Sequence, residues 1–125
     1  MKNNKAFTLI ELMAVITILS IIAIIIIPVL DKNIKKSKQE MYDIQIENIR
    51  IAGQNYYVDN ITLRPTEGNN AFVSQQTLET QNYIKANIKN PKTGESFTNL
   101  YIEVTNDNGK YIYKVCPIET CDAYE

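Results

Sequence analysis

The sequence predicts an α+β fold in which a long N-terminal helix packs on a small antiparallel β-sheet head. Three observations lead to this fold class. A charge-free apolar run extends from Leu12 to Leu30, and a helix-compatible segment with an amphipathic pattern follows it over residues 31–58. Two β-rich stretches then flank an Asn-Gly pair near the C-terminal end. The 125 residues are enough for one small domain in addition to the apolar segment.

The apolar run is long enough to cross a membrane. Only Thr17, Ser20 and Pro28 interrupt its Leu, Met, Ala, Val and Ile residues. As a helix it is about 28 Å long, close to the roughly 30 Å of a bilayer's hydrocarbon core. Pro28 predicts a helix kink, because proline lacks the N–H and its ring crowds the preceding turn.

The amphipathic segment is expected to continue directly from the apolar helix. It contains no proline and only one glycine, Gly53. On a helical wheel one broad apolar stripe appears, with Ile44 and Val58 off it. The stripe consists of Ile34, Met41, Tyr42, Ile46, Ile49, Ile51, Ala52 and Tyr56.

The remaining chain is expected to form the head. Turn-forming residues between Asn60 and Asn70 predict a loop, and residues 74–84 predict a short helix and turn. Residues 90–94, Asn-Pro-Lys-Thr-Gly, are typical of a further turn. Residues 100–105 and 111–115 alternate as strands do, and Asn108-Gly109 between them favours a tight hairpin turn.

The first residues look like a secretory signal but depart from one. Lys2 and Lys5 precede the apolar run and no acidic residue comes before Glu11. However, the run is longer than a signal core, and no small-x-small cleavage pattern follows it. A carboxylate at the mouth of an apolar segment is costly within lipid, so Glu11 needs a partner.

Residues 5–13, Lys-Ala-Phe-Thr-Leu-Ile-Glu-Leu-Met, together with the apolar helix resemble the class III signal of type IV prepilins and pseudopilins. The resemblance implies a pilin-like fold and a cut between Ala6 and Phe7 by prepilin peptidase, which then N-methylates Phe7. Pro28 matches a helix proline that many members have. The family usually has Gly before the cut, and Ala6 is a small replacement for it.

The resemblance also implies a role for Glu11 in subunit assembly. In that family the buried carboxylate pairs with the free amine of the first residue, here Phe7, of a neighbouring subunit. At low effective dielectric either charge alone is heavily penalised, so the pair favours one subunit offset. The alternative is that Glu11 only caps the first helical turn, where the macrodipole favours a negative charge.

The implied organisation has three parts: a cleaved leader 1–6, a transmembrane and filament-core helix 7–30, and a periplasmic or extracellular head 31–125. The implied partners are prepilin peptidase, copies of the chain and other pilins, and the pilus assembly platform with its ATPase. The chain would be a single-pass cytoplasmic (inner) membrane protein before assembly, and then part of a cell-surface or periplasmic filament. The lysines at 32, 35, 36 and 38 would place the head in the cytoplasm under the positive-inside rule, but the signal motif is more specific than a charge count and overrides it here. The alternative is a signal-anchored protein with a cytosolic domain.

Cys116 and Cys121 enclose four residues and are expected to form a short-loop disulfide, in an oxidising compartment. It resembles the cysteine-bounded C-terminal segment of many pilins, and two free thiols are the alternative. The chain has no histidine, so its Cys and His residues alone cannot supply a four-ligand zinc site. An EF-hand calcium loop at Asn106–Gly109 would need acids where Val104 and Val115 stand.

The function predicted from these features is a structural filament subunit, for adhesion, motility or DNA uptake. The alternatives are a pseudopilin of a type II secretion or competence system, and a membrane-anchored binding domain that does not polymerise. No catalytic residue, cofactor or metal is predicted, because no Gly-rich phosphate loop and no nucleophile with a base partner is present. The net charge of −1 gives no support for nucleic acid, which would depend on a local patch at Lys85, Lys89 and Lys92.

Overall fold

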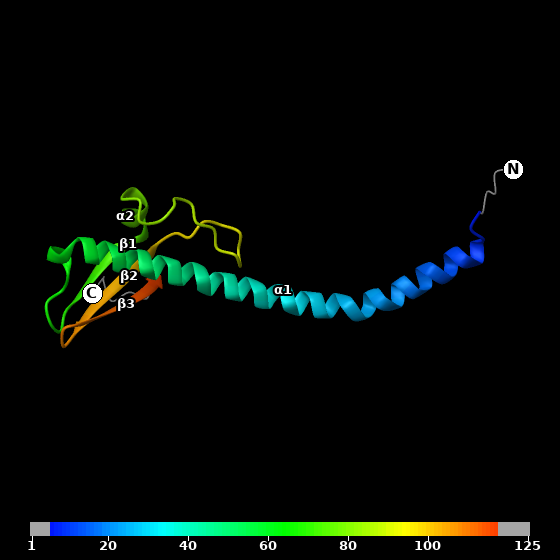
Figure 1. Ribbon diagram of the computed structural model, residues 1–125, viewed down its shortest axis with the longest axis horizontal. Coiled ribbons are helices and arrows are strands. Elements are labelled where there is room, and N and C mark those ends of the chain that lie inside the picture. The colour runs from blue at the N-terminus through cyan, green and yellow to red at the C-terminus, as the bar shows by residue number, and fades with distance from the viewer. Residues whose placement is uncertain (1–5, 118–125) are drawn as a thin grey trace. The chain divides into compact units, whose positions relative to one another are not determined.

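A computed structural model describes residues 6–117 of the chain. A long helix, α1 (Leu9–Asp59), is followed by a short 3-10 helix, η1 (Ile61–Leu63), and by the head elements (Figure 1). These are β1 (Asn70–Ser74), α2 (Gln75–Thr80), β2 (Leu100–Asp107) and β3 (Lys110–Pro117). The chain divides into two compact units between Ser37 and Lys38. The predicted α+β class, with a long helix against a small antiparallel sheet, is confirmed.

The apolar and amphipathic segments belong to one helix, as predicted. The 51 residues of α1 include Pro28, which lies inside the helix rather than at an end of it. The helix ends after Asp59, where the Asn60 side chain donates to the Tyr56 carbonyl at 2.8 Å. The kink expected at Pro28 stays a prediction.

The sheet has the order β1-β2-β3, and both strand pairs are antiparallel. β2 is therefore the central strand, with Val73 of β1 and Val115 of β3 on either side of Ile102. The predicted hairpin is confirmed, and its strands are longer than the sequence pattern indicated. Asn108 and Gly109 form its turn with φ values of 51° and 85°, the left-handed region that these two residue types tolerate best.

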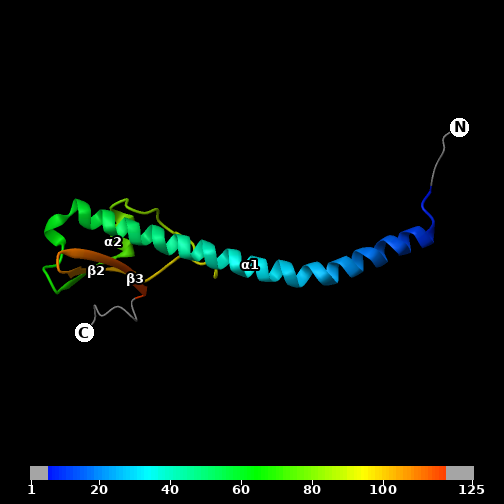
Figure 2. The same ribbon diagram turned by 60° about the horizontal axis from the view of Figure 1, so that its bottom comes forward.

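The core of the head lies between the second half of α1 and one face of the sheet (Figure 2). Alternate residues of β2 point into it, as the two-residue period of a strand requires. Its members come from α1, β1, α2, the segment before β2, and β2. They are Ile49, Ala52, Tyr56, Tyr57, Val73, Leu78, Phe97, Leu100, Ile102 and Val104.

The predicted helix stripe was too broad. Tyr42, Ile46, Ile49, Ala52 and Tyr56 pack in the head as expected. Ile34, Met41 and Ile51 are exposed, and Gly53 and Tyr57 are buried in addition. The difference arises because the sheet contacts only the face of α1 centred near Ile49 and Gly53, whereas hydrophobicity alone does not show where that contact ends.

The loop predicted between Asn60 and Asn70 is present and includes η1, but the strand that follows it was not predicted. β1 has only five residues, too few for a clear alternating pattern, and it lies at an edge of the sheet. Ser74 ends this strand and caps α2, because its side chain accepts from the backbone N–H of Thr77 at 3.2 Å. The short helix expected in this region is thereby confirmed.

Candidate functional site

The residues around the predicted cleavage point lie outside regular structure. Ala6, Phe7 and Thr8 precede α1, and all three are exposed. The Phe7 side chain is 86% exposed. The cut between Ala6 and Phe7 stays a prediction.

Thr8 and Glu11 form a reciprocal cap at the start of α1. The Thr8 N–H donates to Glu11 Oε2 at 3.2 Å, and the Glu11 N–H donates to Thr8 Oγ1 at 3.3 Å. This is a capping box, in which two backbone donors that the first helical turn leaves unpaired each gain a side-chain acceptor. Glu11 thus takes part in the cap of α1, and its pairing with a neighbouring subunit stays a prediction.

The cap leaves the charge of Glu11 uncompensated. Within residues 6–117, the Glu11 carboxylate accepts the Thr8 N–H and forms no ion pair. A capping box fixes the direction of the carboxylate but supplies no cation. If this end of the helix were buried, Glu11 would still require a positive partner from outside the described chain.

The apolar part of α1 exposes its side chains along its whole length. Every large hydrophobic residue from Leu12 to Leu30 is at least 44% exposed. The Thr17 and Ser20 hydroxyls donate to the carbonyls of Met13 and Ile16, at 2.7 and 2.6 Å, so they carry no unpaired donor into apolar surroundings. By length and composition α1 is a helix that could cross a membrane.

The lysines that follow the apolar run lie on exposed helix. Lys35 forms an ion pair with Asp31 at 3.2 Å, one helical turn earlier. Exposed pairs of this kind contribute little to stability.

Cys116 lies on β3 opposite Tyr101 of β2 and is 5% exposed. Its predicted partner, Cys121, lies outside the described residues. The disulfide therefore stays a prediction, and its consequence would be to attach the C-terminal tail beside the Tyr101 position of the sheet.

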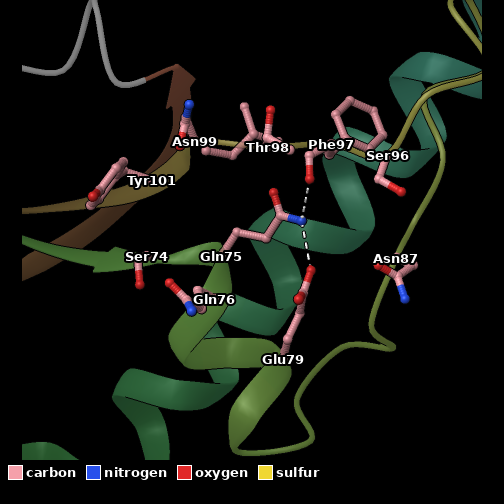
Figure 3. Close-up of a pocket in the computed structure, with 11 residues that line it drawn as sticks. Ser74, Gln75, Gln76, Glu79, Asn87, Ser96, Phe97, Thr98, Asn99 and Tyr101 are labelled. Carbon is pink, nitrogen blue, oxygen red and sulfur yellow. Dashed lines mark hydrogen bonds between the residues drawn. The ribbon is translucent and has the colours of Figure 1, made fainter.

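A polar pocket of about 290 Å³ lies in the head between α2, the segment before β2, and the start of β2 (Figure 3). Gln75 is at its centre, donating through Nε2 to Glu79 Oε1 at 2.7 Å and to the Phe97 carbonyl at 2.9 Å. Gln75 Oε1 is the buried side-chain atom that lacks a partner in the described part of the chain. Ser74 holds the α2 cap here, and the chain has no histidine that could activate its hydroxyl.

The three lysines considered for nucleic acid take part in two different kinds of contact. Lys85 and Lys89 line a second cavity of about 500 Å³ together with Gln45 and Tyr83. Lys92 instead places its Nζ 4.4 Å from the centre of the Tyr42 ring, a cation–π contact. Two lysines at a cavity are few for phosphate-backbone binding, which gains affinity from each neutralised phosphate.

Thr8 is the functional residue that the sequence reasoning did not single out. The signal was present in the sequence as Thr8-x-x-Glu11, the spacing of a capping box before an apolar run. The structure brings Thr8 and Glu11 together at the helix start, whereas Pro28 and the cysteine position at 116 belong to other parts of the chain.

Comparison with protein families matches residues 1–27 to the prokaryotic N-terminal methylation motif, the class III signal of type IV pilins and pseudopilins. The match covers the segment that contains Ala6, Phe7, Thr8 and Glu11. Comparisons with curated proteins and with solved structures found no match.

Proposed function

We propose, on the premise that residues 1–27 carry the prokaryotic N-terminal methylation motif, that this chain is a type IV pilin-like structural subunit that polymerises into a surface filament. Prepilin peptidase would cleave between Ala6 and Phe7 and methylate Phe7. Adhesion, motility and DNA uptake are all compatible with such a filament. A pseudopilin of a secretion or competence system is the close alternative.

The observation that carries the proposal is the combination of this motif with a helix whose apolar side chains are left exposed by the described residues 6–117. From Leu12 to Leu30 the large hydrophobic residues remain at least 44% exposed. An exposed apolar surface of that length is unfavourable in water, at roughly 25 cal/mol for each Å². It can be covered first by lipid and later by the helices of other subunits, which is how a membrane-held precursor becomes a filament subunit.

Glu11 would select the offset at which subunits add. Cleavage at Ala6 creates a new amine on Phe7, and the helices of a filament pack away from water. Glu11, held toward the helix start by Thr8, would pair with that amine on a neighbouring copy. Loss of one member of a buried ion pair costs about 3–5 kcal/mol, whereas loss of a helix cap costs about 1 kcal/mol.

The remaining parts of the proposal follow from cleavage, membrane insertion and assembly of the subunit. Residues 1–6 would be the leader, 7–30 the membrane and filament-core helix, and 31–125 the head outside the cytoplasmic membrane. A Cys116–Cys121 disulfide would form in that oxidising compartment. The other partners would be further pilins and the assembly platform with its ATPase.

The decisive experiment separates the two roles of Glu11. Glu11→Gln removes the charge but keeps a side chain that completes a capping box, and Thr8→Val removes the hydroxyl cap but keeps the charge. Each variant replaces the wild-type gene in cells that contain the assembly machinery, and filaments are sheared from the surface and quantified. Glu11→Gln and Glu11→Val should be processed and membrane-resident yet enter filaments poorly, while Thr8→Val should assemble at near wild-type yield.

Two results would contradict the proposal. Normal filament yield from Glu11→Gln would show that capping, and not charge pairing, is what this position supplies. Mass spectrometry of the N-terminal peptide tests processing directly, and a mature protein that begins with Met1 would rule out both the pilin and the pseudopilin. Imaging of sheared filaments distinguishes a long surface fibre from a short periplasmic one.

A further inference from the structure

The turn between β2 and β3 contains the one Asn-Gly pair of the sequence, Asn108-Gly109. Both residues have positive φ values, and both are exposed to solvent. An asparagine that precedes glycine is chemically labile, because glycine has no side chain to keep its backbone nitrogen away from the asparagine amide carbon. The two residues that suit the hairpin turn are therefore also a reactive pair.

The reaction available to this pair is an intramolecular substitution at the Asn108 side chain. The backbone nitrogen of Gly109 gives its proton to a solvent base and attacks Asn108 Cγ. An N–C bond forms, the Cγ–Nδ2 bond breaks, and the amide nitrogen takes a proton and leaves as ammonia. Water then hydrolyses the resulting succinimide at either carbonyl. The products are aspartate, with the original backbone, and isoaspartate, whose backbone is one atom longer.

Asn106 holds the nitrogen that would attack. The Gly109 N–H donates to Asn106 Oδ1 at 2.9 Å. Asn106 is only 6% exposed, and its Nδ2 donates to the Pro65 carbonyl at 3.0 Å. Its backbone N–H donates to the Asn69 carbonyl at 3.2 Å, and its carbonyl accepts from the Gly68 N–H at 2.9 Å. The acceptor of the Gly109 N–H is therefore fixed by three further hydrogen bonds.

This arrangement opposes the reaction at its first step. The Gly109 N–H must break its bond to Asn106 before a base can remove the proton, and the nitrogen must then approach Asn108 Cγ. The Asn108 amide is held as well, since its Nδ2 donates to Asp107 Oδ1 at 3.2 Å. Solvent reaches the labile pair, but its nucleophile and its amide are both bonded elsewhere.

We propose that Asn108 is a site of spontaneous conversion to aspartate and isoaspartate, and that Asn106 is the positioning residue that slows this conversion by holding the Gly109 N–H. The inference concerns the head alone and does not depend on the filament proposal. Each conversion adds a negative charge beside Asp107. The longer backbone of isoaspartate also displaces Gly109 from Asn106, which joins the hairpin to the loop that contains Pro65.

Peptide mass spectrometry of the full chain in detergent, incubated at mildly alkaline pH, measures the conversion of Asn108. Isoaspartate identifies the succinimide route, because direct hydrolysis of the amide gives aspartate alone. Conversion should be at least about fivefold slower in the folded chain than in the chain unfolded by urea. A fivefold change corresponds to about 1 kcal/mol, the usual net contribution of one hydrogen bond. Equal rates, or no isoaspartate from the unfolded chain, would overturn the proposal.

Variants separate the hydrogen bond from general stability. Asn106→Ala removes the acceptor, whereas Asn106→Asp keeps an oxygen that can accept from the Gly109 N–H. Ile102→Ala is the matched control, because it destabilises the same strand through a cavity and leaves Asn106 in place. In folded samples Asn106→Ala should convert Asn108 at least about fivefold faster than wild type, and the other two variants should stay within about twofold. Equal acceleration in Ile102→Ala or in Asn106→Asp would overturn the role of Asn106.

Amide hydrogen exchange of the wild-type chain gives a readout that needs no variant, and it decides the question if Asn106→Ala does not fold. The Gly109 N–H lies in an exposed turn, yet it should exchange at least about tenfold more slowly than in the unfolded chain. Exchange at the rate of the unfolded chain would show that the bond to Asn106 is not kept in solution, and the proposal would be wrong.

Discussion

Gly53 lies at the closest approach of α1 to the sheet, and Gly53→Ala tests whether that approach controls the stability of the head. An added Cβ would lie 2.6 Å from Ile102 Cγ2 and 2.9 Å from its Cβ and Cγ1. Ile102 is fully buried on the central strand, with Val73 and Val115 beside it, so it has little room to move. The methyl group must therefore push the helix and the sheet apart.

Two opposing terms set the size of the effect. Alanine is favoured over glycine inside a helix by about 1 kcal/mol, which would stabilise α1. Overpacking a filled core costs about 1–3 kcal/mol, and a contact of 2.6 Å places Gly53→Ala in the upper part of that range. We therefore expect Gly53→Ala to destabilise the head by about 1–2 kcal/mol, although helix propensity alone would make it stabilising.

The assay is urea denaturation of the detergent-solubilised chain, followed by near-ultraviolet circular dichroism of its eight tyrosines. Asn55→Ala is the matched control, because Asn55 is an exposed position two residues further along the same helix and alanine there meets no core. The control should be as stable as wild type or slightly more stable. Gly53→Ala should lower the urea midpoint.

A double-mutant cycle with Ile102→Ala identifies the contact responsible. Ile102→Ala alone should cost about 2–5 kcal/mol through the cavity it leaves. Because it removes the two γ carbons nearest the new methyl, the double variant should be about 1 kcal/mol more stable than the sum of the single effects. A Gly53→Ala chain as stable as Asn55→Ala, or a cycle with no coupling, would show that the closeness of helix and sheet is not what keeps glycine at this position.

Three further predictions concern the head and the leader. Burial raises the pKa of Tyr57, so its phenol should stay protonated in the folded head above pH 10, where the unfolded chain ionises. The free energy of unfolding should then be unaffected below about pH 10 and fall above it, by up to about 1.4 kcal/mol per pH unit. In urea titrations at about pH 9 to 11, Tyr57→Phe should make this fall shallower. An unchanged dependence of stability on pH in Tyr57→Phe would contradict the role of Tyr57. Asn106 donates to the Pro65 carbonyl at 3.0 Å and accepts from the Gly109 N–H at 2.9 Å. Asn106→Ala should therefore cost about 2–3 kcal/mol of unfolding free energy, and a loss under 0.5 kcal/mol would show that water replaces both bonds. If the leader is cut as proposed, Ala6→Gly should be processed at least as fast as wild type in a pulse-chase experiment, and slower cleavage would contradict the assumed cut position.

The sequence alone was enough to predict the long helix, the hairpin and the segment that matches the N-terminal methylation motif. These features are local: a charge-free run of 19 residues from Leu12 to Leu30, an Asn-Gly turn between alternating strands, and a short motif before the helix. Each depends on neighbours within a few residues, so backbone and side-chain preferences are sufficient to predict it. The cap formed by Thr8 and Glu11 is also a local feature, and the Thr8-x-x-Glu11 spacing would have been enough to predict it.

The tertiary structure decided which residues of α1 face the sheet. Ile49 and Ile51 are both isoleucine and only two residues apart, yet the first is fully buried and the second 41% exposed. Composition cannot separate them, because burial depends on where the sheet lies against the helix. The same placement explains why glycine occupies position 53 and why β1 forms from a five-residue segment paired with β2. Those features depend on contacts between segments far apart in the sequence, and only the folded head brings the segments together.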